Sequence, residues 1–269
     1  MIGIVYSTLD EASLNMAEYI KSEHGFSEGK FNGRDCFTDG RFCIYKTEKL
    51  LVELEEADAY GLELIYFLSK HSSSKGIAAL TAHATGNWTK EAKLGGKPYQ
   101  LSVSAPVEMH AILKGLKNMG LEGVDVSYEA THHGPLIKTP SMFVEIGGNA
   151  ETVGDVEIAA KVGEVVYKSV SGNLEEHFDK IAIGIGGTHY PRKFSDMALN
   201  KGYAFAHIMA KYAIEVGDTA NNFYMIKQAF ERSKEKPEIA VIDWKSMNGR
   251  IRDKVINELK EIGIDYERV

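Results

Sequence analysis

The sequence has little cysteine, and this limits the ways in which the fold can be cross-linked. Only Cys36 and Cys43 occur among 269 residues, and their spacing matches no zinc-knuckle pattern. They flank an Asp39-Gly40 step, a residue pair typical of a tight hairpin turn. We expect two reduced thiols in or beside the core. A single disulfide or half of a zinc site is the alternative, which a reducing compartment disfavours.

The sequence also lacks a long apolar run and an excess of positive charge. The longest apolar stretches, such as Leu64–Leu68 and Ile77–Leu80, are far shorter than the roughly 20 residues that span a bilayer. We therefore expect no membrane segment. The start, Met1–Tyr6, has no basic region and no small-residue cleavage site, which predicts a cytoplasmic protein without a secretory signal. The net charge of −7 argues against general nucleic-acid binding, so we expect no DNA partner, although a local basic patch can still contact phosphates.

Strand-like and helix-like segments alternate along the chain. The first, Met1–Ser7, is followed by a capping pattern from Thr8 and an amphipathic helix. Further strands are predicted at Leu62–Ser69, Gly76–Thr81, Val124–Ala130, Ser141–Ile146, Lys180–Ile185 and Ile239–Trp244. Helices are predicted at Pro106–Met119, Asp155–Val170, Thr219–Arg232 and Asn248–Ile262, because apolar residues recur there at spacings of three and four.

This alternation predicts an α/β fold: a three-layer α/β/α arrangement whose sheet is mostly parallel or mixed. With 44% hydrophobic residues, the chain can bury a full core as one compact unit over residues 1–269. A second, smaller lobe is an alternative, with its boundary near residue 190. We expect a monomer rather than an obligate oligomer.

Histidines follow four of the predicted strands. They are His71, His83, the doublet His132-His133, and His189. Ligands of open α/β sheets bind beyond the carboxyl ends of the strands, and parallel strands bring these ends to one edge. We therefore expect these imidazoles to converge there. Taken one at a time, each histidine is equally compatible with a solvated loop or a satisfied hydrogen bond.

The histidine doublet carries a constraint of its own. Glu129 precedes it and Gly134-Pro135 follows it. If the pleat of the strand continues, neighbouring side chains point to opposite faces and only one of the pair joins the site. His133 is our choice, because the turn behind it places it at the rim.

A carboxylate in an apolar strand adds to this set. Glu145 lies between Val144 and Ile146 near a strand end, and a buried carboxylate needs a partner. Imidazole nitrogen and carboxylate oxygen together suit zinc. We expect zinc ligands among five residues: His83, His132, His133, Glu145 and His189.

A glycine-rich loop, residues 183–196, follows the Lys180–Ile185 strand. Gly184, Gly186 and Gly187 allow a close approach of backbone amides to a phosphate or an oxyanion, and a tight turn is the alternative. The spacing of the glycines does not fit a dinucleotide fingerprint. Tyr190 and Arg192 follow the loop as substrate-binding candidates.

Other polar residues extend the predicted substrate site. His71 is one candidate, and Asn87 can orient a carbonyl or cap a turn. Lysines and arginines gather near residues 90–97, 114–117 and 192–193. They form either a track for phosphates or ordinary solvated surfaces.

Five motifs together resemble one family. "SKHSS", "LTAHATGN", "EATHHGP", "PSMFVEIG" and "GIGGTHY" occur in the order found in the archaeal and plant type of D-aminoacyl-tRNA deacylase. The resemblance runs from Met1 to about residue 210. It implies an enzyme that hydrolyses the ester between a D-amino acid and the terminal ribose of tRNA, a dependence on zinc, and a fold similar to the phosphorylase and peptidyl-tRNA hydrolase type.

Under this hypothesis His133, Glu145 and His189 are catalytic, zinc activates the attacking water, and the glycine loop stabilises the oxyanion. Two alternatives remain open at this point. One is a zinc-dependent peptidase or amidohydrolase that acts on small substrates. The other is a noncatalytic module that binds tRNA or a nucleotide and uses the histidines and glycines to hold phosphate.

Overall fold

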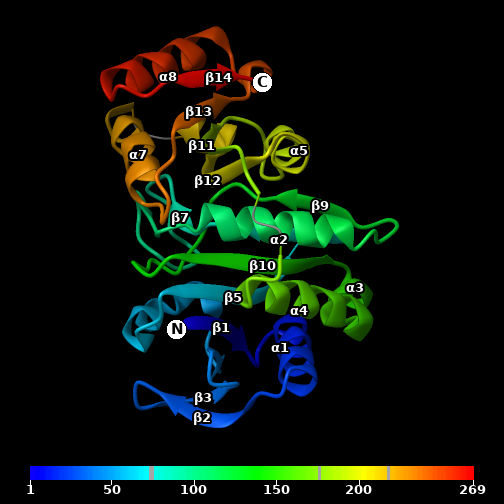
Figure 1. Ribbon diagram of the computed structural model, residues 1–269. Helices are drawn as coiled ribbons and strands as arrows, with labels where there is room; N and C mark the ends of the chain where they lie inside the picture. Colours follow the sequence, from blue (N-terminus) through cyan, green and yellow to red (C-terminus); the bar gives the residue numbers. More distant parts are fainter. Residues whose placement is uncertain (73–75, 175–176, 217–218) are drawn as a thin grey trace.

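The computed structural model describes residues 1–72, 76–174, 177–216 and 219–269. Residue 73 of the "SKHSS" motif therefore lies outside the described residues. Strands and helices alternate along the chain; the described strands form a larger sheet in one half of the molecule, a smaller sheet in the other half (Figure 1), and the two-stranded pair β7-β8.

The larger sheet has eight strands in the order β2-β3-β4-β1-β5-β10-β6-β9. Their bounds are β1 Ile2–Ser7, β2 Ser27–Phe31, β3 Arg34–Thr38, β4 Phe42–Thr47, β5 Leu64–Ser72, β6 Ala79–His83, β9 Asp125–Tyr128 and β10 Ser141–Gly148. Strands β4, β1, β5 and β10 run parallel to one another. Strand β6 runs antiparallel to β10, and β9 follows the direction of β6. The sheet is therefore mixed.

Helices α1, α2 and α4 cover one face of the larger sheet. They are Glu11–Glu23, Pro106–Asn118 and Val156–Val170. Asp10 caps α1 by accepting from the Ser13 amide, Asp155 caps α4 in the same way, and α2 begins with a proline. The apolar side chains of these helices pack against alternate residues of the strands, such as Met142, Val144 and Ile146 of β10. Two 3₁₀ helices, η1 Leu51–Glu53 and η2 Glu55–Tyr60, pack on the opposite face.

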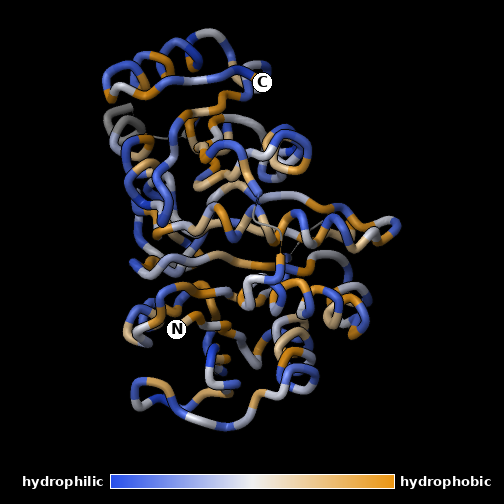
Figure 2. The backbone as a smooth tube through the Cα atoms, viewed as in Figure 1, coloured by the Kyte–Doolittle hydropathy of each residue, from blue (hydrophilic) through white to orange (hydrophobic). Residues whose placement is uncertain are grey.

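The smaller sheet consists of four parallel strands in the order β12-β11-β13-β14. The bounds are β11 Lys180–Ile185, β12 Tyr203–Met209, β13 Ile239–Ile242 and β14 Tyr266–Arg268. Helices α5 Arg192–Lys201, α6 Lys211–Val216, α7 Thr219–Glu231 and α8 Gly249–Glu261 accompany it, and the short elements α3 Ala150–Gly154, β7 Gly86–Asn87, β8 Gln100–Leu101 and η3 Trp244–Ser246 complete the chain. Helix α2 contacts both β6 and β12, so it joins the two halves. Figure 2 shows the hydrophobic residues concentrated along the central strands, while hydrophobic and hydrophilic residues alternate along the outer helices.

The predicted α/β class with a mixed, helix-covered sheet is confirmed, and all four predicted helices are present to within a residue or two of their predicted ends. The hairpin at Asp39-Gly40 joins β3 and β4, and Cys36 and Cys43 are buried free thiols. Strand β12 and helix α5 were not predicted. The division of the chain near residue 190 stays a prediction. Among the described residues, no helix has the length and apolar character needed to cross a bilayer.

Gly134 holds the loop behind the histidine doublet in a tight packing. A Cβ atom at this position would lie 2.2 Å from the Val52 carbonyl oxygen and 2.4 Å from the Gly96 amide nitrogen, both backbone atoms that cannot move aside cheaply. We predict that Gly134→Ala lowers the free energy of unfolding by about 1–3 kcal/mol through overpacking. Urea denaturation followed by circular dichroism measures this. Gly249→Ala, where a Cβ meets nothing within 4 Å, is the control and should be nearly neutral.

Glu258 on α8 makes stability depend on pH. Its side chain is buried, and this raises its pKa to about 7, although Lys254 at 3.9 Å acts in the opposite direction. The folded state thus keeps the proton to higher pH than the unfolded state, so this contribution is complete below about pH 4.5 and is lost as pH rises to 7. We predict that Glu258→Gln stabilises the protein by about 1–2 kcal/mol at pH 8 and by nothing at pH 4.5. Unfolding curves at both values test this, with the exposed Glu122→Gln as control. An equal effect at both values would contradict it.

Candidate functional site

The site lies on the face of the larger sheet that the helices α1, α2 and α4 leave uncovered. Side chains two residues apart share a face of a strand. Leu80 and Ala82 of β6 pack under the helices, so Thr81 and His83 point to the other face. The same alternation places His71 of β5 and Glu145 of β10 on that face, and Glu129 next to them after β9.

The histidines converge as predicted, but the prediction that they meet at one edge of the sheet is wrong. Because β6 runs antiparallel to β10, His83 pairs with Phe143 near the start of β10, whereas His71 pairs with Gly147 near its end. The two imidazoles therefore approach from opposite directions. They meet over the middle of β10, where Glu145 projects between them.

Glu129 is the central residue that the sequence analysis mentioned and did not assign to the site. Its carboxylate is fully buried, with Oε1 3.1 Å from Nδ1 of His71 and Oε2 2.9 Å from Nε2 of His189. His132 Nε2 lies 3.7 Å from Oε2. The signal was available: Glu129 stands between apolar Tyr128 and Ala130, as Glu145 stands between Val144 and Ile146.

Backbone hydrogen bonds fix Glu129 between the two halves of the molecule. Its own amide donates to the Ala82 carbonyl of β6. The next two amides, Ala130 and Thr131, donate to the carbonyls of His189 and Ile208 in the smaller half. This crossing segment brings His189 from the glycine loop to the carboxylate.

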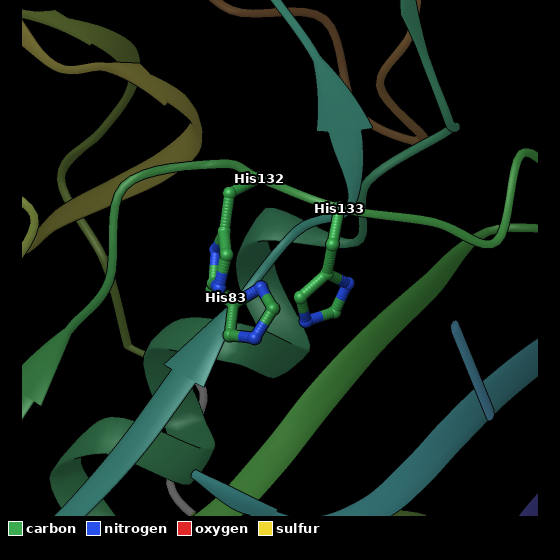
Figure 3. Close-up of side chains that lie close together, drawn as sticks. All are labelled: His83, His132 and His133. Carbon is green, nitrogen blue, oxygen red and sulfur yellow. The ribbon is translucent and has the colours of Figure 1, made fainter. Parts of the chain in front are cut away.

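Three histidines point toward one another beside this carboxylate (Figure 3). Nδ1 of His83 lies 3.1 Å from the Ala84 carbonyl oxygen, Nδ1 of His132 lies 2.9 Å from that of Ala130, and Nδ1 of His133 contacts that of Gly134. A carbonyl only accepts, so each Nδ1 carries the proton, and each Nε2 presents a lone pair when the ring is neutral. These contacts fix the orientation of all three rings.

Both members of the doublet face the site. Their side chains would point to opposite faces only if the strand continued through the doublet. It does not, because β9 ends at Tyr128 and His133 has a positive φ of 42°. The ring centroids of His132 and His133 lie 4.4 and 4.9 Å from that of His83. A left-handed residue thus replaces the pleat and turns the two rings to the same side.

The electrostatics divide the cluster into charged and neutral groups. Burial opposes the charge of His71, but contacts with Glu129 and Glu145 outweigh it and raise the pKa of His71 to about 10. Burial likewise raises the pKa of both carboxyls, and the facing imidazoles more than reverse this, so the pKa of Glu129 is well below its usual range and that of Glu145 is lowered too. Burial and the neighbouring His83 lower the pKa of His133 to about 4 and also lower that of His132.

The predicted substrate-binding residues lie around this centre. The Tyr190 hydroxyl is 2.5 Å from Nε2 of His71, and Arg192 pairs with Asp125 on β9. Asn87 donates its amide to the Gly95 carbonyl and lines a cavity beside His132.

The three loop glycines have different surroundings. Gly184 lies within β11 against the ring of Phe194, while Gly186 and Gly187 have positive φ. The Gly187 amide donates to the Ser246 hydroxyl at 2.9 Å. An anion role for these glycines stays a prediction.

The cluster fits a metal ion. Within the described residues, His83, His132 and His133 offer nitrogen atoms within 4.8 Å of one another, and two further sets combine histidine with Glu129 or Glu145. Nε2 of His83 is buried and forms no hydrogen bond within the described part of the chain. A buried nitrogen of this kind needs a partner, and a cation bound there would supply one.

Comparisons with known proteins identify the family of this chain. A family model described as D-aminoacyl-tRNA deacylase matches residues 59–267. Proteins named D-aminoacyl-tRNA deacylase from Pyrococcus abyssi and Ignicoccus hospitalis are 34% and 39% identical, and in both cases the match covers 98% of this chain and 98% of the relative. A relative of the same name from Methanosarcina mazei is 35% identical, with 98% of this chain and 90% of the relative covered.

One solved structure has the same fold throughout. It is a crystal structure described only as a conserved protein of unknown function, 29% identical, with a TM-score of 0.88 over 100% of this chain and 95% of that one. The predicted hydrolytic enzyme is thus confirmed at the level of the family. The chain belongs to the D-aminoacyl-tRNA deacylase family, as the five motifs predicted.

Proposed function

We propose that this protein hydrolyses the ester bond of D-aminoacyl-tRNA, and that a zinc ion held by His83, His132 and His133 takes part. One observation carries the proposal: three imidazoles, of which His83 and His133 are buried and His132 is partly exposed, have Nδ1 on backbone carbonyls and leave Nε2 for a common centre. Three protein ligands with one open position are typical of catalytic zinc, and a backbone partner on the second ring nitrogen is the usual support.

The histidines of the site fall into two groups, those suited to bind the metal and those that contact Glu129. His132 and His133, whose pKa values are lowered, are neutral near pH 7 and suited to a metal. His71 and His189 instead contact Glu129, which orients them. When bound, zinc supplies Lewis acidity and a lowered pKa of water near the carbonyl to be attacked. Glu145 and His189 remain predicted catalytic residues, to which we add Glu129.

The carboxylates are placed to move protons. Glu145 is ionised, buried and 3.6 Å from Nε2 of His83, so it can accept the proton of the water that attacks the aminoacyl carbonyl carbon. The oxygen of that water forms the new bond to carbon. Glu129, held by His71 and His189, keeps a negative charge beside the reacting atoms and orients both imidazoles.

The leaving group needs a proton, and His71 can provide it. Its raised pKa keeps it protonated near pH 7. The hydroxyl of Tyr190 lies 2.5 Å from Nε2 of His71 and at the wall of the large cavity. As the ester carbon–oxygen bond breaks, the ribose oxygen takes this proton, directly or through Tyr190, which yields free D-amino acid and tRNA.

Basic side chains beside the site suit the phosphates of tRNA. Lys114, Lys117 and Arg192 line a groove of about 270 Å³ between α2, β9 and α5. The groove shares Asp125 and Arg192 with the large cavity, so the two adjoin. This basic groove also contains Asp125, which pairs with Arg192, and Asp196, so its positive charge is local and suits one particular anionic partner rather than general nucleic-acid binding.

The family match favours deacylation over the two alternatives, a zinc-dependent peptidase or amidohydrolase and a noncatalytic binding module. A peptidase would cleave small amides without tRNA, and a binding module would turn over nothing. The cytoplasmic location and the monomeric state also stay predictions.

We predict that the purified protein binds zinc and that His83→Gln removes most of this binding. The glutamine keeps the bulk of the ring but offers no matching nitrogen at the centre of the cluster. Metal content after dialysis, measured by atomic emission, tests the prediction, and chelator should abolish hydrolysis of D-tyrosyl-tRNA until zinc is restored.

His177→Gln is the matched control, because His177 is a largely exposed histidine whose Nε2 lies 3.6 Å from a carboxylate oxygen of Asp179. It should bind zinc as the parent does. Full activity in metal-free protein would exclude a role for zinc and leave the imidazoles as general bases.

We predict that Glu129→Gln lowers kcat for D-tyrosyl-tRNA by about 10²–10⁴ with little change in KM. The substitution keeps the shape and removes the charge that orients His71 and His189, and groups of this kind contribute to the transition state by such factors. Single-turnover deacylation measures the effect, with L-tyrosyl-tRNA as the test of selectivity.

Glu164→Gln provides the comparison, since Glu164 also holds an imidazole, that of His24, at 2.9 Å but far from this cluster. It should leave kcat unchanged. Thermal melts of both variants separate loss of chemistry from loss of folding, and a Glu129→Gln protein with parental kcat would refute the assignment.

A further inference from the structure

Two separate cavities open on the proposed catalytic cluster. The larger, of about 740 Å³, is lined by His71, His189 and Tyr190 together with residues of the glycine loop and α5. The smaller, of about 320 Å³, is lined by His132, Trp88, Thr131 and Tyr212. They have no lining residue in common.

The boundary between the cavities is the cluster itself. The rings of His132 and His189, one from each cavity, have centroids 4.6 Å apart. Tyr212 of the smaller cavity places its hydroxyl 3.5 Å from Nδ1 of His189. A molecule that occupies both cavities must therefore pass over the imidazoles of His132 and His189, beneath which Glu129 is buried.

An aminoacyl ester has the matching shape. Its reacting carbonyl joins a bulky nucleoside on one side to a smaller amino acid on the other. We propose that the two cavities divide the substrate, with the terminal adenosine of tRNA in the larger one and the amino-acid side chain in the smaller one. This assignment rests on the proposed deacylase function.

The chemistry of the larger cavity suits a nucleoside and its phosphate. Tyr190, Pro191 and Ile77 offer flat or apolar surfaces for a base. Asp243 and Ser246 offer oxygen atoms for ribose or base hydrogen bonds. Arg192, at the rim, is shared with the basic groove that leads away along α2, which is the direction left for the preceding nucleotides.

The smaller cavity has the features of an amino-acid site. Trp88 forms an apolar wall, held by a hydrogen bond from its Nε1 to the Thr131 carbonyl. Ala213 and Gly86 leave room beside it. Glu91 adds a carboxylate at the rim, which suits the positive α-ammonium group. It has less than half the volume of the larger cavity, about 320 against 740 Å³, and so suits the smaller part of the substrate.

The assignment makes opposite predictions for a residue in each cavity. Thr89→Phe, at the partly exposed wall of the smaller cavity, should lower kcat/KM for D-tyrosyl-tRNA by about tenfold or more and spare D-alanyl-tRNA, because only the large side chain loses its space. Ile77→Trp, at an exposed position of the larger cavity, should lower kcat/KM for both by a similar factor.

Inhibition by adenosine monophosphate provides an independent measurement. It should compete with D-tyrosyl-tRNA in the parent and in Thr89→Phe, and lose potency in Ile77→Trp. Free D-tyrosine should show the reverse pattern. Thermal melts confirm that both variants are folded, and Thr89→Leu replaces Thr89→Phe if the latter is not.

Three outcomes would overturn the assignment. Thr89→Phe could affect both substrates equally, Ile77→Trp could change the ratio between them, or the nucleotide could lose potency in Thr89→Phe alone. Failure of the proposed function looks different, since the parent would then hydrolyse neither substrate. Activity in the parent with the wrong pattern in the variants refutes only the division of the substrate.

Discussion

Glu129 is a charged group with no access to solvent, and the site depends on how that charge is compensated. Taking a carboxylate out of water costs several kcal/mol, which a single partner rarely offsets. Glu129 is surrounded instead by imidazoles from three segments, His71 in β5, His132 after β9 and His189 after β11. Since His189 belongs to the smaller half of the molecule, the carboxylate links the two halves electrostatically. The backbone hydrogen bonds of Ala130 and Thr131 to that half also link the two halves.

The histidines differ in what they can do because their partners differ. A carboxylate partner favours the charged imidazolium, as at His71. Burial and neighbouring imidazoles favour the neutral ring, as at His132 and His133, where the backbone carbonyl on Nδ1 only fixes which nitrogen carries the proton. One cluster of a single residue type thus contains both proton donors and suitable metal ligands. The surroundings of each ring, and not the residue type, decide which of the two roles a histidine suits.

The sequence predicted the alternation of strands and helices, and every helix with a clear apolar periodicity was found. It missed β12, whose residues Tyr203–Met209 are all buried, because a short apolar run without alternation does not distinguish a buried strand from a buried helix segment. It missed α5, which begins directly after Pro191 and was interpreted as part of the glycine loop. In both segments the tertiary surroundings, a sheet flanked on both faces and a helix that covers it, supplied the stabilisation that local pattern did not reveal.

The sequence by itself determined which chemical groups are available and, within each strand, which side chains share a face, because the period of two is a property of the chain. Only the tertiary structure decided how they meet. The antiparallel direction of β6 and the left-handed backbone of His133 are set by pairing and loop packing over long sequence separations. As a result, the histidines meet over the middle of β10, with a cavity on either side, and not at the edge of the sheet.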